Sequence, residues 1–210
     1  MRLFSPLPSQ LIKQTEKRHW NNPKIQNRVG ETFNSCTRHV PRAWDMSKTQ
    51  MIILRGNENC GKTTLCAAVY RQLLQYANIE HSFGQVGKPM KTVKQDSIEL
   101  DEKGNIRDFQ TLLTVGGKKI GFFSMGDYVP DYLKINIRFF IDIEVAILVC
   151  CTRSRNRNNS TYRYYEETYG QLRKKIYWTE FAQNKNDMYK IKDKQAETIV
   201  QDILSELHNM

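Results

Sequence analysis

Short apolar runs alternate with amphipathic segments along most of the chain. Residues 51–55 (Met-Ile-Ile-Leu-Arg) predict a buried strand, and apolar positions at helical spacing from Leu65 to Tyr76 predict a helix over about 62–76. The most apolar run, at 145–151, is typical of a strand at the centre of a sheet. This alternation indicates an α/β domain in which helices cover a sheet.

A β-hairpin is expected in the middle of the chain. Gly116 and Gly117 lie between two apolar segments, 106–115 and 119–124, and a type I′ turn needs positive φ at both of its central residues. The segment 78–96 has no regular pattern and is expected to be irregular. Further elements are expected as helices at 130–142, 163–173 and 193–208, the last with Asp193 as its N-cap, and as a strand at 175–181.

The first 45 residues differ from the rest. They hold four of the six prolines and show no sustained period of 2 or 3.6. We therefore expect an irregular basic extension at 1–45 and an α/β core at 46–210. Two interpretations of the extension stay open: it binds phosphate or a partner, or it precedes a core whose own start is Met46.

The formal net charge of +10 is concentrated in two segments. Residues 1–45 hold eight basic and three acidic residues, and residues 152–175 hold seven basic and two acidic ones. The rest of the chain is balanced. Basic clusters attract phosphate groups on nucleotides, nucleic acids or lipids, although a solvated surface explains such runs equally well.

The five cysteines are odd in number and lack the spacing of a zinc site. The amino-terminal stretch is broken by proline, and no apolar run approaches the ~20 residues of a membrane helix. A disulfide scaffold, a structural zinc and a membrane partner are therefore not expected. The prediction is a cytoplasmic protein.

The strongest motif is Gly-Asn-Glu-Asn-Cys-Gly-Lys-Thr at 56–63, which fits G-x-x-x-x-G-K-[ST]. It follows the first strand and precedes the first helix, where backbone N–H groups can surround a phosphate. Lys62 would neutralise charge on the β- and γ-phosphates, and the Thr63 hydroxyl would ligate Mg²⁺. The predicted nucleotide-binding residues of this segment are Gly56, Asn57, Glu58, Asn59, Cys60, Gly61, Lys62, Thr63 and Thr64.

This motif and its strand–helix context resemble the P-loop NTPase superfamily. The resemblance implies a three-layer fold with a mostly parallel sheet, an antiparallel hairpin, helices on both faces, and Mg²⁺-nucleotide at the carboxyl ends of the strands. Glu58 makes the loop similar to that of thymidylate-kinase-like deoxynucleotide kinases, whose loop acid contacts the sugar of the acceptor substrate. The Asp-Arg-aromatic motif of that family's acceptor site is missing from the sequence.

A P-loop enzyme also places an acid at the end of a neighbouring strand, where it holds Mg²⁺. Asp127 follows the strand at 119–124 on the expected edge and is the predicted metal-binding and catalytic acid. Asp142 and Glu144 are alternatives, in a string where an acid would point away from the phosphates. Ser124, at the strand tip, is a candidate for contact with the metal through water.

The basic segment after the central strand looks like the arginine-bearing lid of small nucleotide kinases. Arginine binds phosphate through paired hydrogen bonds and stabilises charge during phosphoryl transfer. Arg153 is the predicted catalytic arginine, with Arg155 and Arg157 as nucleotide-binding residues and Arg163 as a weaker candidate. An alternative is a surface for single-stranded nucleic acid, whose bases stack on aromatic rings. The rings concerned are Tyr162, Tyr164, Tyr165 and Tyr169.

The string Asn-Lys-Asn-Asp at 184–187 matches the N-K-x-D guanine-reading motif of GTPases, but the D-x-x-G switch motif is missing from the sequence. ATP is therefore the expected nucleotide, with GTP as the alternative. The predicted function is Mg²⁺-dependent ATP hydrolysis or γ-phosphoryl transfer to a small acceptor. The alternative is a nucleotide-gated module that binds nucleic acid or a protein.

Overall fold

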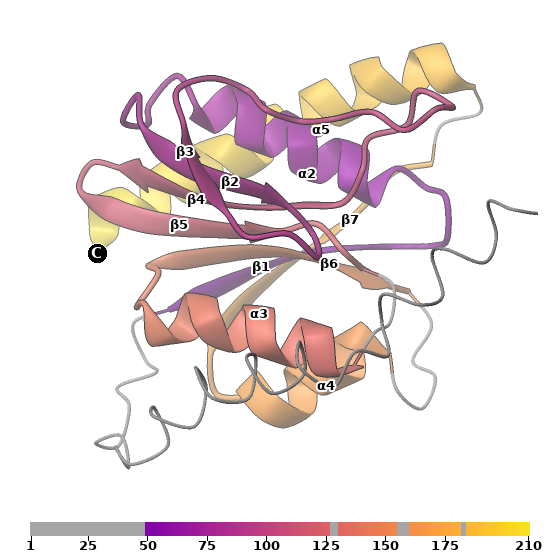
Figure 1. Cartoon of the computed structure of the whole chain (residues 1–210). Coiled ribbons are helices and arrows are strands. Elements are labelled where there is room, and N and C mark those ends of the chain that lie inside the picture. Colours follow the sequence, from indigo (N-terminus) through magenta and orange to yellow (C-terminus); the bar gives the residue numbers. More distant parts are fainter. Residues whose placement is uncertain (1–48, 127–129, 155–159, 182–183) are drawn as a thin grey trace, which may run out of the picture. The chain divides into compact units, whose positions relative to one another are not determined.

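The computed structural model describes residues 49–126, 130–154, 160–181 and 184–210, all within one compact unit, Asp45–Met210 (Figure 1). The predicted extension at 1–45 lies outside the described residues. Within the described ranges the fold is α/β, with a seven-stranded mixed sheet and four helices.

The sheet has a parallel half and an antiparallel half. Its strands are β1 (Gln50–Gly56), β2 (His81–Gln85), β3 (Lys91–Val93), β4 (Phe109–Val115), β5 (Lys118–Phe123), β6 (Ile147–Arg153) and β7 (Arg173–Trp178). Their order across the sheet is β3-β2-β4-β5-β6-β1-β7. β5, β6, β1 and β7 are parallel to one another, whereas β4 is antiparallel to β5 and to β2, and β2 is antiparallel to β3. The carboxyl ends of β2, β5, β6, β1 and β7 therefore lie at the same edge as the start of β4.

Helices cover both faces of the sheet (Figure 1). They are α2 (Lys62–Leu73), α3 (Pro130–Asp142), α4 (Thr161–Tyr169) and α5 (Lys185–Asn209). α2 and α5 lie on one face, and α3 and α4 lie on the other. Each face of the sheet has its own hydrophobic core, and alternate residues of β1 point into the two cores. Ile52 and Leu54 pack with α2 and α5, and Met51 and Ile53 pack with α3 and α4. Because both faces of this strand are buried, its sequence is a continuous apolar run.

The antiparallel half is larger than the predicted hairpin. The turn itself is confirmed, because Gly116 and Gly117 have φ angles of 55° and 78°. The segment 78–96, however, is not wholly irregular: it contains β2 and β3. In β2 the sequence His-Ser-Phe-Gly-Gln shows no apolar alternation, so its strand state comes from pairing with β4 rather than from local pattern.

The helices agree with the expected ones in position, and α3 has the predicted bounds. α5 is the main exception. It begins at Lys185 rather than near Asp193, so Asp193 lies inside the helix and is not its N-cap. In the part of the chain that the structure describes, no helix is both long enough and apolar enough to cross a membrane.

A close contact between β5 and α3 gives a test of this packing. A Cβ on Gly121 would lie 2.5 Å from Cδ1 of Phe140, which is fully buried. Gly121→Ala should therefore overpack this core and lower the free energy of unfolding by roughly 1–3 kcal/mol in urea denaturation. In a Phe140→Leu background the penalty of the same substitution should shrink. An equal loss in both backgrounds would show that the ring is not the obstacle.

Candidate functional site

The loop at 56–63 turns the chain from β1 into α2. Gly61 is the N-cap residue of α2 and has a φ of 82°, and Asn59 also has a positive φ of 58°. The left-handed conformation at Gly61 is costly for residues with a Cβ, which explains the need for glycine there. The tip residues 57–59 are exposed, whereas Cys60 is buried beneath them. The loop is thus anchored at its base and open at its tip.

The start of α5 lies against this loop. A Cβ on Gly61 would lie 2.7 Å from Sδ of Met188 and 3.0 Å from Cε of Lys192, so a larger residue would have to displace the Met188 side chain. Lys192 is fully buried, and its ammonium group donates a hydrogen bond to the carbonyl of Glu180. Burial lowers the pKa of Lys192. A second lysine is therefore fixed behind the loop, in addition to Lys62.

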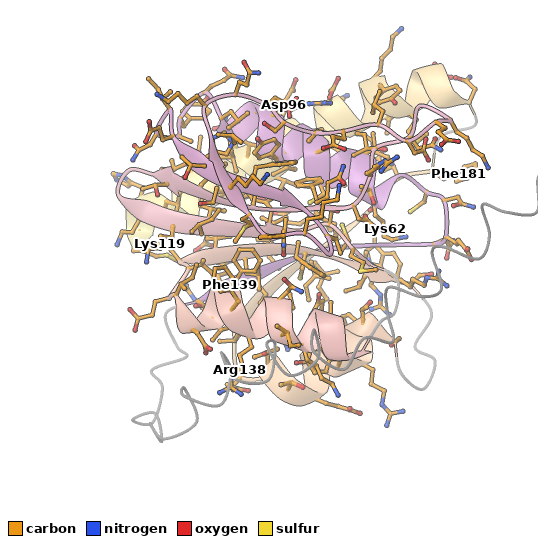
Figure 2. All side chains as sticks on the ribbon, in the orientation of Figure 1. Lys62, Asp96, Lys119, Arg138, Phe139 and Phe181 are labelled. Carbon is orange, nitrogen blue, oxygen red and sulfur yellow. The ribbon has the colours of Figure 1, made fainter. Side chains whose placement is uncertain are left out.

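The start of α2 is suited to an anion. Gly61 provides no side-chain cap, and the first turn holds no acidic residue. The partial positive charge of the helix start is therefore not neutralised from within the helix. Lys62, labelled in Figure 2, adds a full positive charge: it is only 8% exposed, and its Nζ donates to the carbonyl of Asn57 at 2.7 Å. This bond draws the ammonium group over the loop.

A cavity of about 440 Å³ opens in front of the loop and the helix start. It brings together six of the nine predicted loop residues with residues from three later segments. Its lining consists of Glu58, Asn59, Gly61, Lys62, Thr63, Thr64, Asn105, Ile106, Asp108, Gly126 and Met188. The remaining loop residues, Gly56, Asn57 and Cys60, do not line it. The site is therefore a polar cavity with a lysine and two threonines at its base.

Asp108 is the site residue that sequence reasoning missed. Its Oδ1 accepts hydrogen bonds from the Thr63 hydroxyl at 2.9 Å and from the Ser124 hydroxyl at 3.0 Å. Ser124 is fully buried, and its Oγ accepts from the N–H of Phe109 at 2.8 Å. Ser124 is thus engaged with Asp108 and the backbone. A signal for this arrangement exists in the sequence, because the Gly116-Gly117 turn fixes the register that brings the start of β4 beside the end of β5.

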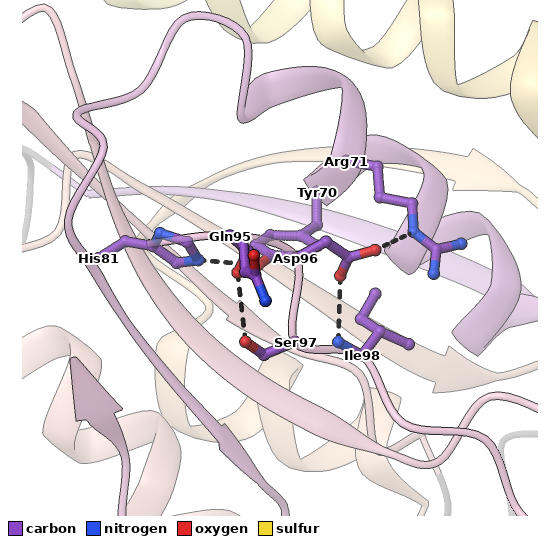
Figure 3. Close-up of polar contacts among 7 residues, drawn as sticks. All are labelled: Tyr70, Arg71, His81, Gln95, Asp96, Ser97 and Ile98. Carbon is purple, nitrogen blue, oxygen red and sulfur yellow. Dashed lines mark hydrogen bonds and ion pairs between the residues drawn. The ribbon is translucent and has the colours of Figure 1, made fainter. Parts of the chain in front are cut away.

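The connection that leads to Asp108 is tied to α2 (Figure 3). Nε of Arg71 donates to Asp96 at 2.7 Å, and Asp96 also accepts from the N–H of Ile98 at 3.0 Å. Beside them, the Tyr70 hydroxyl and Nε2 of His81 share a hydrogen bond of 2.8 Å, and burial raises the pKa of Tyr70. The helix that begins with Lys62 therefore also positions the segment that carries Asp108.

The predicted arginine, Arg153, does not itself line the cavity but pairs with Glu58, which does. Arg153 ends β6, and its guanidinium is 3.8 Å from the carboxylate of Glu58. Both side chains are well exposed, so this ion pair contributes little stability and is easily replaced. Arg153 is thus held near the loop by a weak bond to one of the loop's own residues.

The next residue, Ser154, joins the start of the basic segment to the loop. Its N–H donates to the carbonyl of Gly56 at 3.0 Å, and its hydroxyl donates to the side chain of Asn57. Arg55 donates to the carbonyl of Ser154 at 2.9 Å and lies 3.8 Å from the centre of the Tyr162 ring. These bonds fix where the segment after β6 leaves the sheet.

Three predicted site residues, Asp127, Arg155 and Arg157, lie outside the described residues. Asp142 is the last residue of α3, and Glu144 lies in the connection to β6. Neither residue lines the cavity. Among the described residues, no three His, Cys, Asp or Glu side chains gather to hold a metal ion together. A metal here would need further oxygen ligands.

The tyrosine-rich segment does not form an exposed stacking surface. Tyr165 and Tyr169 are buried in the core under α3 and α4. Tyr162 is half-buried beneath Arg55, and Tyr164 is half-buried with its ring centre 5.9 Å from that of Tyr165. The apolar face of α4 accounts for Tyr165 and Tyr169.

The Asn-Lys-Asn-Asp string at 184–187 forms the start of α5. The Asn184 side chain accepts from the N–H of Asp187 at 2.9 Å and donates to its carboxylate at 2.5 Å. Asn184 is therefore the N-cap, and Asp187 is the acid of the first turn. A capping role accounts for both residues that would read guanine.

No family model matches the chain, and comparisons with curated proteins and with solved structures also found no match. The site is therefore interpreted from its own residues and contacts.

The capping role of Asn184 can be separated from guanine recognition by two substitutions. Asn184→Ala should lower the free energy of unfolding by about 1 kcal/mol, because the start of α5 loses its cap. Asn184→Ser should retain most of the stability, since serine caps equally well. Urea denaturation measures both. Loss of GTP binding with unchanged stability in either variant would favour guanine recognition instead.

Proposed function

We propose that this protein binds a nucleoside triphosphate with Mg²⁺ and catalyses hydrolysis or transfer of the γ-phosphoryl group, with ATP as the expected nucleotide. One observation carries the proposal: an uncapped helix start, with Lys62 and Thr63 at its first positions, forms the base of a polar cavity. The G-x-x-x-x-G-K-T sequence occupies this position in the fold. On this proposal the mixed sheet with helices on both faces is a P-loop NTPase fold of three layers.

The chemistry follows from charge and position. The backbone N–H groups at the start of α2 and the ammonium group of Lys62 would bind the β- and γ-phosphates. Thr63 would supply one oxygen ligand to Mg²⁺, which prefers oxygen ligands and is commonly held by one or two protein groups together with phosphate oxygens.

Arg153 is the proposed contact for charge that develops on the transferring group. It now pairs with Glu58, and a phosphate would compete for the same guanidinium. Positioning and charge stabilisation would supply most of the rate enhancement, as is general for phosphoryl transfer. The bond from the γ-phosphorus to the β–γ bridging oxygen breaks, and the nucleoside diphosphate leaves with its electron pair. The new bond forms from the γ-phosphorus to the oxygen of water or of an acceptor hydroxyl, whose proton passes to solvent.

Substitution of Lys62 tests the binding site. Lys62→Ala should weaken Mg²⁺-ATP binding about ten- to a hundredfold in titration calorimetry, since hydrogen bonds to charged groups are worth about 1.5–3 kcal/mol. Lys118→Ala is the matched control, because Lys118 begins β5 at the opposite edge of the sheet. Unchanged affinity in Lys62→Ala would reject the proposed phosphate site.

The fate of the γ-phosphate distinguishes the possible reactions. The protein is incubated with γ-labelled ATP or GTP, with and without a mixture of nucleosides and nucleotides, and with and without single-stranded DNA or RNA. We expect label in free phosphate or in a new small molecule, and loss of both products in Lys62→Ala. Release of label only with nucleic acid would favour the nucleotide-gated module, and no release under any condition would contradict an enzyme.

A further inference from the structure

The carboxylate that bonds to the Thr63 hydroxyl belongs to Asp108, directly before the antiparallel strand β4. Resting on the function proposed above, we propose that Asp108, at the entry to the antiparallel strand β4, is the carboxylate that positions Thr63 and Mg²⁺. The tip of the parallel strand β5 holds Ser124 where an acid is expected.

The sheet explains how an antiparallel strand can take this role. β4 pairs with β5 so that Gln110 lies opposite Phe123, and the register continues to Phe109 and Ser124, whose backbones are joined by a 3.0 Å hydrogen bond from the N–H of Ser124 to the carbonyl of Phe109. The residue before β4 therefore stands at the same edge as the residue after β5. Asp108 reaches the cavity from a strand that runs in the opposite direction.

The hydrogen bonds give the carboxylate a defined orientation. A hydroxyl group has one proton to donate and two lone pairs. Thr63 donates its proton to Oδ1 of Asp108, so the lone pairs of Thr63 are directed away from that carboxylate. Ser124 donates to the same Oδ1 and accepts from the N–H of Phe109. The fixed Ser124 hydroxyl therefore holds the carboxylate in one orientation.

The backbone of Asp108 is also fixed. Its carbonyl accepts from the N–H of Val86 at 3.0 Å, and Phe109, the next residue, is fully packed in the core. Asp108 itself is half-buried and lines the cavity together with Lys62 and Thr63. It is the one carboxylate among the described residues that both lines this cavity and bonds to the predicted metal-ligating hydroxyl. Partial burial strengthens its interaction with a cation.

The experiment measures the affinity for Mg²⁺ rather than turnover. Mg²⁺ is titrated into the full-length protein with a fluorescent ATP analogue bound, and binding of the analogue is measured separately in EDTA. Asp108→Asn retains the size of the side chain and can still accept from Thr63 and Ser124, but it removes the charge. It should weaken Mg²⁺ binding roughly ten- to a hundredfold while leaving binding of the analogue in EDTA close to that of the wild type.

Other variants make the assignment specific. Ser124→Ala should weaken Mg²⁺ binding in the same direction but less, because Asp108 keeps its charge and loses one orienting bond. Thr63→Ser should retain Mg²⁺ binding and Thr63→Val should lose it. Glu102→Gln is the matched control, since it removes a carboxylate from the exposed turn of the same connection. It should bind Mg²⁺ as the wild type does.

Several results would overturn the assignment. One is wild-type Mg²⁺ affinity in a folded Asp108→Asn variant. Another is loss of Mg²⁺ affinity in Asp127→Asn with none in Asp108→Asn. If Asp108→Asn fails to fold, Asp108→Glu moves the charge outward by one methylene, and unchanged Mg²⁺ affinity in that variant contradicts the proposal. Failure of the proposed function itself looks different: the wild-type protein would bind no analogue in either condition.

Discussion

The parallel pairing of β1 with β6 on one side and β7 on the other determines where the candidate site stands. In this register Gly56 lies opposite Arg153, and Arg55 lies opposite Trp178. Because all three strands end at the same level, the loop after β1 meets the start of the basic segment after β6. The hydrogen bonds of Ser154 to Gly56 and Asn57 follow from this alignment. A shift of one residue in the pairing of β1 with β6 would move Arg153 away from its place opposite Gly56 and invert the two faces of β1 relative to β6.

A second constraint is the meeting of parallel and antiparallel strands at this edge. β5 ends there and β4 begins there, so Ser124 and Asp108 become neighbours although 16 residues separate them along the chain. The same edge holds Thr63 at the start of α2. Three side chains from three segments are thereby brought into one hydrogen-bonded group. This hydrogen-bonded group is polar although the surrounding sheet is apolar. Such a polar group is more typical of a binding site than of a hydrophobic core.

Much of the parallel half could be predicted from the sequence, because strands and helices with a buried face have a clear apolar period. This period is present in β1, β6, α2 and α3. The turn at Gly116 and Gly117 could be predicted because residues other than glycine rarely adopt positive φ. Six of the nine loop residues predicted from the motif line the cavity. β2 and β3 could not be predicted from the sequence, since pairing with neighbouring strands holds them in place and they carry few apolar side chains.

The other features that local patterns do not reveal depend on tertiary contacts. Asp108 precedes a strand, and an acid in that position has no local signal unless the register of the hairpin is followed to its end. The tyrosines at 162–169 have the composition of a stacking surface, but helical spacing directs Tyr165 and Tyr169 into the core. Likewise, Asn184 and Asp187 fit a guanine-reading pattern and a helix cap equally well, and the two differ only in which hydrogen bonds form.

The central claim is that the start of α2 binds the phosphates of a nucleotide. Backbone amide NMR shifts of the ¹⁵N-labelled protein, titrated with Mg²⁺ and ADP, test this claim most directly. The account predicts that the largest shifts occur at the amides of residues 59–64, with no comparable change at Gly116 and Gly117 on the opposite edge of the sheet. Absence of shifts at 59–64, or larger shifts at another part of the surface, would contradict it.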